Sequence, residues 1–106
     1  MAVVKLSITP IEGFPGNYRV EVSGSGFEPN QQVIWRLKGE DTFIDDNIIA
    51  PRGGGLIGPD GTFFFTDNAI GGNLDEDWGE DEIYADVYYT NLGGSHHKSN
   101  TVSRSF

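Results

Sequence analysis

The densest group of residues able to do chemistry is an acidic segment, LDEDWGEDE at residues 74–82, which places six carboxylates around Trp78. Hard cations such as Ca²⁺ prefer several oxygen ligands that converge from one loop. We therefore consider Asp75, Asp77 and Asp81 as a candidate Ca²⁺ site. The spacing of an EF-hand is absent, because the third ligand and the glycine do not follow in register. A solvated acidic loop that keeps the protein soluble is the alternative interpretation.

Other residues that could support catalysis are sparse. His96 and His97 are adjacent, so on a strand their imidazoles would point to opposite faces and could not share a metal ion. The serines and acids lack the nucleophile elbow or the paired arrangement that a hydrolase needs. The glycine-rich stretch at residues 51–61 lacks the lysine and the following helix of a phosphate-binding loop. We therefore predict that the chain is not an enzyme.

Aromatic side chains provide the best binding candidates. Tyr84 and Tyr88 fall on the outward phase of one predicted strand, and we expect Phe64 and Trp78 to be exposed as well. Planar rings on a sheet face are used by carbohydrate-binding modules and by protein interfaces. Cover by the glycine-rich loops is the competing interpretation, and it needs no partner.

A second interface candidate is the segment PRGGGLIGP at residues 51–59. It carries Leu56 and Ile57 among glycines and prolines, a setting that we predict to be too flexible to hold them in a core. Apolar side chains on a flexible arm are usually covered by a partner. We therefore expect this arm to contribute to association with another protein or with a second copy of the chain.

Length and charge narrow the class of protein. The 106 residues are the size of a single domain, and the absence of cysteine excludes disulfides. The net charge of -9 arises entirely within residues 53–97, which contain nine carboxylates and no Lys or Arg. Such a chain should repel nucleic acid and anionic membrane surfaces. The first residues lack the basic and apolar regions of a signal peptide, so we expect synthesis in the cytoplasm.

The apolar pattern predicts strands and no helix. Apolar residues alternate with polar ones through most of the chain. Phe27 is expected to close the open end of the core, and Trp35 to face the small Ala85. About seven short strands with turn signals between them are typical of a β-sandwich. The predicted strands are at residues 3–9, 18–22, 33–37, 42–50, 63–65, 83–90 and 100–106.

Three short motifs resemble those of bacterial Ig-like domains of the IPT/TIG kind. They are GSGF-x-P-N-x-x-V at residues 24–33, DGTFFFT at residues 60–66 and KSNTVS at residues 98–103. The resemblance extends over the whole chain and implies a single Ig-like antiparallel β-sandwich of about seven strands.

This resemblance leaves two classes of function open. In the first, the chain is a structural or accessory subunit that docks on a larger assembly, for example as a virion decoration or tail protein. In the second, it is a carbohydrate- or Ca²⁺-binding module of a bacterial surface protein. We expect a protein partner in the first class, and a homo-oligomer is a further possibility.

Overall fold

The computed structural model describes residues 2–39, 47–70, 81–90 and 96–104, and only the backbone of residues 47–51, 70, 81 and 104. These ranges contain eight strands and no helix, so none of the described residues belongs to a helix that could span a membrane. The strands are β1 (Val3–Pro10), β2 (Asn17–Ser25), β3 (Gln32–Gly39), β4 (Asn47–Leu56), β5 (Phe63–Ile70), β6 (Asp81–Tyr89), β7 (His96–Lys98) and β8 (Val102–Arg104).

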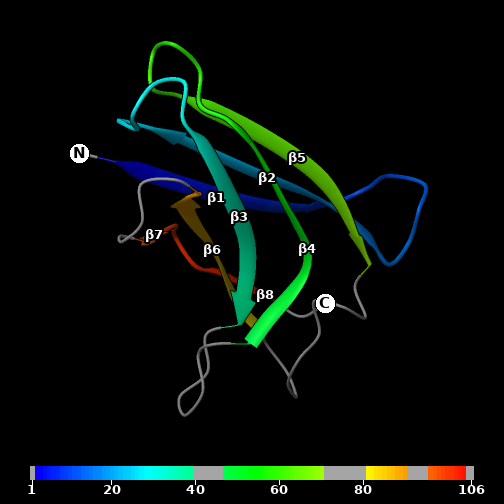
Figure 1. The fold of residues 1–106 in the computed structure, drawn as a ribbon. Coiled ribbons are helices and arrows are strands. Elements are labelled where there is room, and N and C mark those ends of the chain that lie inside the picture. Colours follow the sequence, from blue (N-terminus) through cyan, green and yellow to red (C-terminus); the bar gives the residue numbers. More distant parts are fainter. Residues whose placement is uncertain (1, 40–46, 71–80, 91–95, 105–106) are drawn as a thin grey trace.

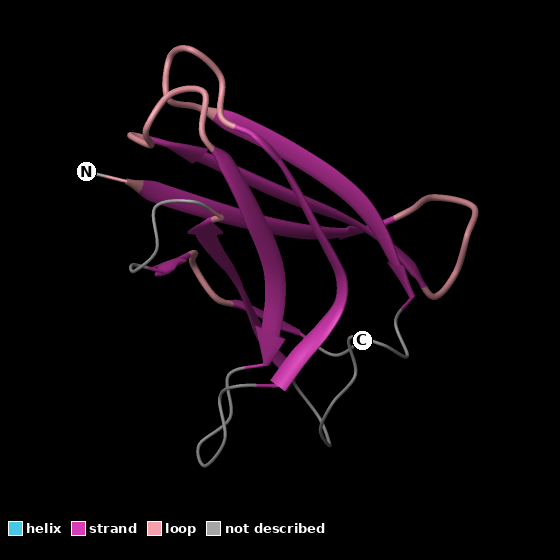
Figure 2. Cartoon of the chain, viewed as in Figure 1, coloured by secondary structure: helices cyan, strands magenta, loops and turns pink. Residues whose placement is uncertain are grey.

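The strands form two sheets, which Figure 1 and Figure 2 show as two layers whose strands cross at a wide angle. One is a three-stranded sheet in the order β1-β2-β5. The other is a five-stranded sheet in the order β4-β3-β6-β7, with β8 also paired to β6. All the pairs are antiparallel. The predicted all-β sandwich is confirmed, with eight strands because β7 forms between the predicted strands at residues 83–90 and 100–106.

The core lies between the two sheets and follows the predicted alternation. The inward residues of β1, β2, β3 and β6 are buried: Val4, Leu6, Ile8, Val20, Val22, Val33, Trp35, Leu37, Ile83, Ala85 and Val87. The expected neighbour of Trp35 is wrong, because Ala85 pairs with Leu37 instead. Trp35 lies between Val87 on β6 and Gly53 on β4.

Phe27 closes one end of the core, as predicted. Its ring centroid lies 5.1 Å from that of Phe63, 5.8 Å from that of Tyr89 and 5.0 Å from that of His97. Gly26 has a positive φ of 75°, which suits the turn that follows β2. Rings from both sheets therefore meet around Phe27 and exclude water from this end.

Most of the glycine-rich segment 51–59 belongs to β4, which ends at Leu56, so the predicted flexible arm is wrong. Residues 52–56 pair with residues 32–36 of β3. A Cβ at Gly53 would lie 3.0 Å from the Trp35 indole nitrogen, and a Cβ at Gly55 would overlap the Phe65 ring. These glycines therefore make room for aromatic rings. Ile57 is buried in the core, which contradicts its predicted exposure, whereas Leu56 is exposed as predicted.

Ser99 and Asn100 connect the two sheets. The Ser99 backbone N–H donates to the Ala85 carbonyl at 2.9 Å, and the Ser99 hydroxyl accepts from the Ala85 N–H at 2.8 Å. The Asn100 side chain accepts from the Leu6 N–H at 2.8 Å and donates to the Leu6 carbonyl at 3.1 Å. This side chain replaces a neighbouring strand at the edge of β1, a position that would otherwise present unpaired backbone groups.

Candidate functional site on the outer face of the five-stranded sheet

A row of charged residues crosses the outer face of the five-stranded sheet. The alternation that directs Trp35 inward directs Arg36 outward. The register places Arg52 on β4 opposite Arg36, Arg36 opposite Asp86 on β6, and Asp86 opposite Lys98 on β7. The row therefore has the charge order positive, positive, negative, positive across four neighbouring strands.

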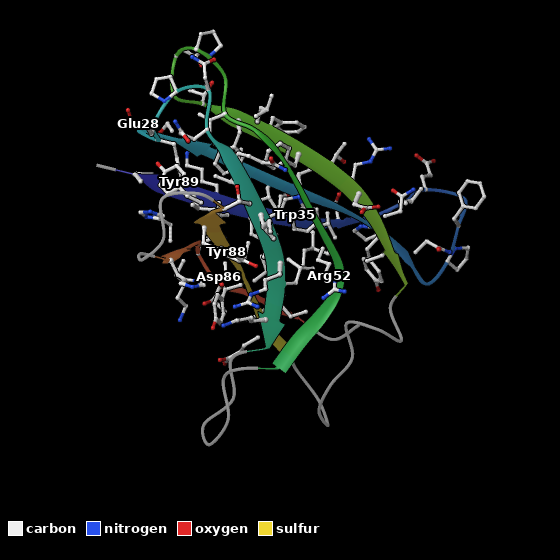
Figure 3. The ribbon with its side chains drawn as sticks, in the orientation of Figure 1. Glu28, Trp35, Arg52, Asp86, Tyr88 and Tyr89 are labelled. Atoms are coloured by element: carbon white, nitrogen blue, oxygen red, sulfur yellow. The ribbon has the colours of Figure 1, made fainter. Side chains whose placement is uncertain are left out.

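Asp86 is the centre of this row. It is 3% exposed, and its carboxylate accepts from the Arg36 Nε at 3.2 Å. The His96 Nδ1 lies 2.8 Å from Oδ2 and 3.0 Å from Oδ1 of the same carboxylate, and the Lys38 Nζ lies 3.9 Å away. A buried carboxylate is costly without partners, so Asp86 depends on these contacts. The same contacts hold Arg36, Lys38 and His96 in position around it. Figure 3 shows Asp86 and Tyr88 beside each other on the outer side of β6.

Two tyrosines of β6 flank the row, and basic side chains cover both rings. The Lys98 Nζ lies 4.3 Å from the centroid of Tyr84, which is only 7% exposed. The predicted exposure of Tyr84 is therefore wrong, because Lys98 covers the ring in a cation–π contact. Tyr88 is half-buried, with the Arg36 guanidinium 5.2 Å and the His96 ring 4.7 Å from its centroid.

We call this surface the cationic face, comprising Arg36, Lys38, Arg52, Glu82, Tyr84, Asp86, Tyr88, His96 and Lys98. It holds four of the seven Lys and Arg residues of a chain whose net charge is -9. Asp86 and the exposed Glu82 of β6 are the carboxylates that the described strands place on it. Four cations and two carboxylates leave a local charge of +2 with histidine neutral. The cationic face is therefore opposite in sign to the molecule as a whole.

Arg52 is the least compensated charge on the cationic face. Like charges directly opposite each other destabilise a sheet, and Arg52 lies directly opposite Arg36. Arg36 turns to Asp86, whereas Arg52 is exposed and belongs to none of the ion pairs formed among the described residues. Figure 3 shows Arg52 on β4, set apart from Asp86.

The other predicted interface residues are dispersed over the molecule. Phe64 is 62% exposed, as predicted, but lies on the outer face of the three-stranded sheet. There it borders a shallow depression of about 610 Å³ together with Val3, Lys5, Ser7, Glu21 and Ser23. Leu56 is exposed at the end of β4, next to Gln32. The two side chains therefore lie on different faces: Leu56 is on the outward phase of β4, the face that also carries Tyr84 and Tyr88, whereas Phe64 belongs to the other sheet.

The candidate metal site falls largely outside the described residues. Asp75, Asp77 and Trp78 lie in residues 71–80, and for Asp81, which begins β6, only the backbone is described. Within the described part of the chain, no three His, Cys, Asp or Glu side chains form a group that could hold a metal ion.

The two histidines lie in β7 and point to opposite faces, as expected for adjacent residues on a strand. His96 contacts Asp86 on the outer face, and His97 contacts Phe27 at the end of the core. Sequence reasoning missed the cationic face as a unit. Arg36 and Lys38 are visibly on the outward phase of their strand, but their distance along the chain from Arg52 and Lys98 hides the pairing that unites them.

Comparisons with known proteins support the fold alone. No protein-family model matches the chain, and no curated protein matches it significantly. A solved structure, the X-ray structure of Northeast Structural Genomics Consortium target SoR45, is similar with a TM-score of 0.50 and 10% sequence identity. The similarity covers 98% of this chain and 85% of that one. At this identity the match describes a shared sandwich architecture, and the resemblance to IPT/TIG-type domains stays a prediction.

Proposed function

We propose that the chain is a non-catalytic interaction module that docks on a larger protein assembly through the cationic face. The observation that carries this proposal is the row Arg52, Arg36, Asp86 and Lys98, which crosses four strands between two tyrosines. A virion decoration or tail protein is one form that such a subunit would take.

The composition and rigidity of the cationic face support docking. Arg and Tyr are enriched at the energetically dominant positions of protein interfaces. Asp86 and the strand ladders hold the basic side chains in place before a partner arrives. Such preorganisation favours affinity, because fewer side chains lose conformational freedom on binding.

The surroundings of His96 favour binding over catalysis. A His–Asp pair can orient a general base, but nucleophilic catalysis also needs a hydroxyl or thiol beside the imidazole. Both hydrogen-bond contacts described for His96 involve its Nδ1 and the Asp86 carboxylate. We therefore interpret the pair as part of the scaffold of the cationic face.

Cosedimentation with the purified parent assembly tests this proposal. We expect the double variant Arg52→Ala with Lys98→Ala to lose binding. The matched control is Lys5→Ala with Arg19→Ala, which removes two cations from the outer face of the three-stranded sheet. Retained binding by the first variant, or an equal loss by both, would contradict docking through the cationic face.

A second candidate function, carbohydrate binding, is supported by the depression beside Phe64. An exposed ring can stack on the apolar face of a sugar, and Lys5, Glu21 and Ser23 supply polar groups around it. Nuclear magnetic resonance (NMR) titration with neutral mono- and disaccharides tests this candidate. Binding should be lost in Phe64→Ala and retained in Phe14→Ala, because Phe14 is equally exposed at 63% but lies in the turn between β1 and β2. Failure of every sugar to shift residues around Phe64 would exclude it.

A further inference from the structure

We infer that the partner surface recognised by the cationic face is a carboxylate-rich protein surface. This inference rests on the proposed function and adds the chemistry of the partner. Its basis is charge complementarity: counted over the side chains that the structure describes, the cationic face carries +2 within a chain of net charge -9. A partner rich in carboxylates would be attracted to this face and repelled by the acidic remainder, so the charge distribution would also orient the complex.

The pairing inside the cationic face leaves basic groups available to such a partner. Asp86 is already shared by Arg36, Lys38 and His96, and strand β3 separates it from Arg52, with which it forms no ion pair. Arg52 and Arg36 remain adjacent with the same sign. A carboxylate bound above this pair would relieve the repulsion between them, because a guanidinium presents a planar fork of donors suited to a carboxylate.

The aromatic rings argue for a protein partner rather than a nucleic acid. Proteins that bind single strands stack bases on free aromatic faces. Here Lys98 lies over Tyr84, and Arg36 and His96 lie over Tyr88. These contacts compete with base stacking.

The test uses the full chain with poly-L-glutamate as the probe, at low ionic strength, followed by ¹⁵N chemical shifts. We expect saturable shifts on β3, β4, β6 and β7, with none around Phe64. Arg52→Glu is compared with Arg19→Glu, since each changes the net charge from -9 to -11. Because only Arg52 lies on the cationic face, Arg52→Glu should weaken binding about tenfold or more and Arg19→Glu much less.

Each outcome is decisive for the inference. Poly-L-glutamate binding that Arg52→Glu and Arg19→Glu weaken equally would overturn it, as would tighter binding of oligo(dT) than of poly-L-glutamate. Absence of poly-L-glutamate binding would overturn it too. If Arg52→Ala with Lys98→Ala nevertheless abolished cosedimentation with the assembly, docking through the cationic face would stand with a different partner chemistry. If poly-L-glutamate did not bind and Arg52→Ala with Lys98→Ala left cosedimentation with the assembly unaffected, the proposed function would fail as well.

Discussion

Asp86 organises the outer face of the five-stranded sheet at the scale of single residues. Its carboxylate is buried and contacts Arg36, Lys38 and His96, which come from two different strands. Without that carboxylate, Arg36 and Lys38 would remain close together with no described acid between them. The arrangement of the cationic face therefore depends on one side chain.

Replacing Asp86 with Asn should destabilise the fold. Removing one partner of a fully buried ion pair costs about 3–5 kcal/mol. We expect about 2–3 kcal/mol here, because the basic partners are partly exposed and water can compensate them. Urea unfolding measures the change, and Asp67→Asn on an exposed position of β5 is the control. Equal stability of the two variants would show that Asp86 does not hold the basic groups.

Asp60 illustrates a local effect on a pKa. The Thr62 hydroxyl donates to the Asp60 carboxylate at 2.7 Å and the Thr62 N–H donates at 3.1 Å. These hydrogen bonds, the one from the side chain first, lower the pKa of Asp60 below its ordinary value of 3.8. Since the folded pKa is the lower one, the turn is stabilised above the unfolded value and loses this contribution as pH falls through the folded pKa.

The variant Thr62→Val should raise the pKa of Asp60 towards its ordinary value, because the hydroxyl donor is lost. An NMR titration of the Asp60 carboxyl carbon measures the shift. Thr66→Val, which removes an exposed hydroxyl from β5, is the control and should leave Asp60 unchanged. An unchanged pKa in Thr62→Val would assign the lowering to other groups.

At the scale of elements, the strands with alternating apolar residues could be predicted, whereas for β4 the predicted strand at residues 42–50 covers only its first part and the glycine-rich part was missed. Val4, Leu6 and Ile8 identify their buried face by period two alone. Gly53 and Gly55 carry no such signal, because their contribution is the space they leave for Trp35 and Phe65. A glycine run interpreted from sequence as a flexible arm is therefore a strand in the folded chain.

Gly55→Ala tests the packing of β4. The added methyl group would overlap the Phe65 ring, and we expect overpacking to cost about 1–3 kcal/mol. Phe65→Leu should reduce that cost in the double variant, since the smaller side chain gives way. A double-mutant cycle of chemical unfolding measures the coupling. Additive effects of the two substitutions would contradict the contact.

The candidate site could be predicted only in part, for a related reason. The outward phase of β6 correctly places both Tyr84 and Tyr88 on the outer face, but it does not predict that Lys98 covers the Tyr84 ring and that this ring is buried. Lys98 is 14 residues from Tyr84 in sequence and reaches it through the pairing of β7 with β6. Register across strands is set by the whole sheet, so the cationic face becomes visible only in the folded molecule.

At the scale of the whole molecule, the described side chains of the cationic face are opposite in sign to the net charge of the chain. Residues 53–97 contain nine carboxylates, and the cationic face gathers four of the seven Lys and Arg residues. A domain with such asymmetry approaches a charged partner in a preferred orientation.

We predict that millimolar Ca²⁺ raises the melting temperature only modestly above Na⁺ at matched ionic strength. Either ion screens the repulsion among the six clustered carboxylates and so stabilises the folded chain. A specific Ca²⁺ site would stabilise it further as Ca²⁺ occupies the site. Differential scanning calorimetry measures the melting temperature in Ca²⁺ and in Na⁺. A rise of many degrees specific to Ca²⁺, abolished by Asp75→Asn with Asp77→Asn, would instead establish a Ca²⁺ site.

Site-specific labelling tests docking through the cationic face most directly, because the chain has no cysteine of its own. Gln32→Cys places a thiol at an exposed position opposite Leu56 on the outer side of β3, and Thr66→Cys places one on the outer side of β5. Maleimide labelling rates are measured for each variant, free and bound to the assembly. Docking through the cationic face predicts that binding slows labelling at position 32 and leaves position 66 unchanged. Protection of position 66 with full reactivity at position 32 would contradict it.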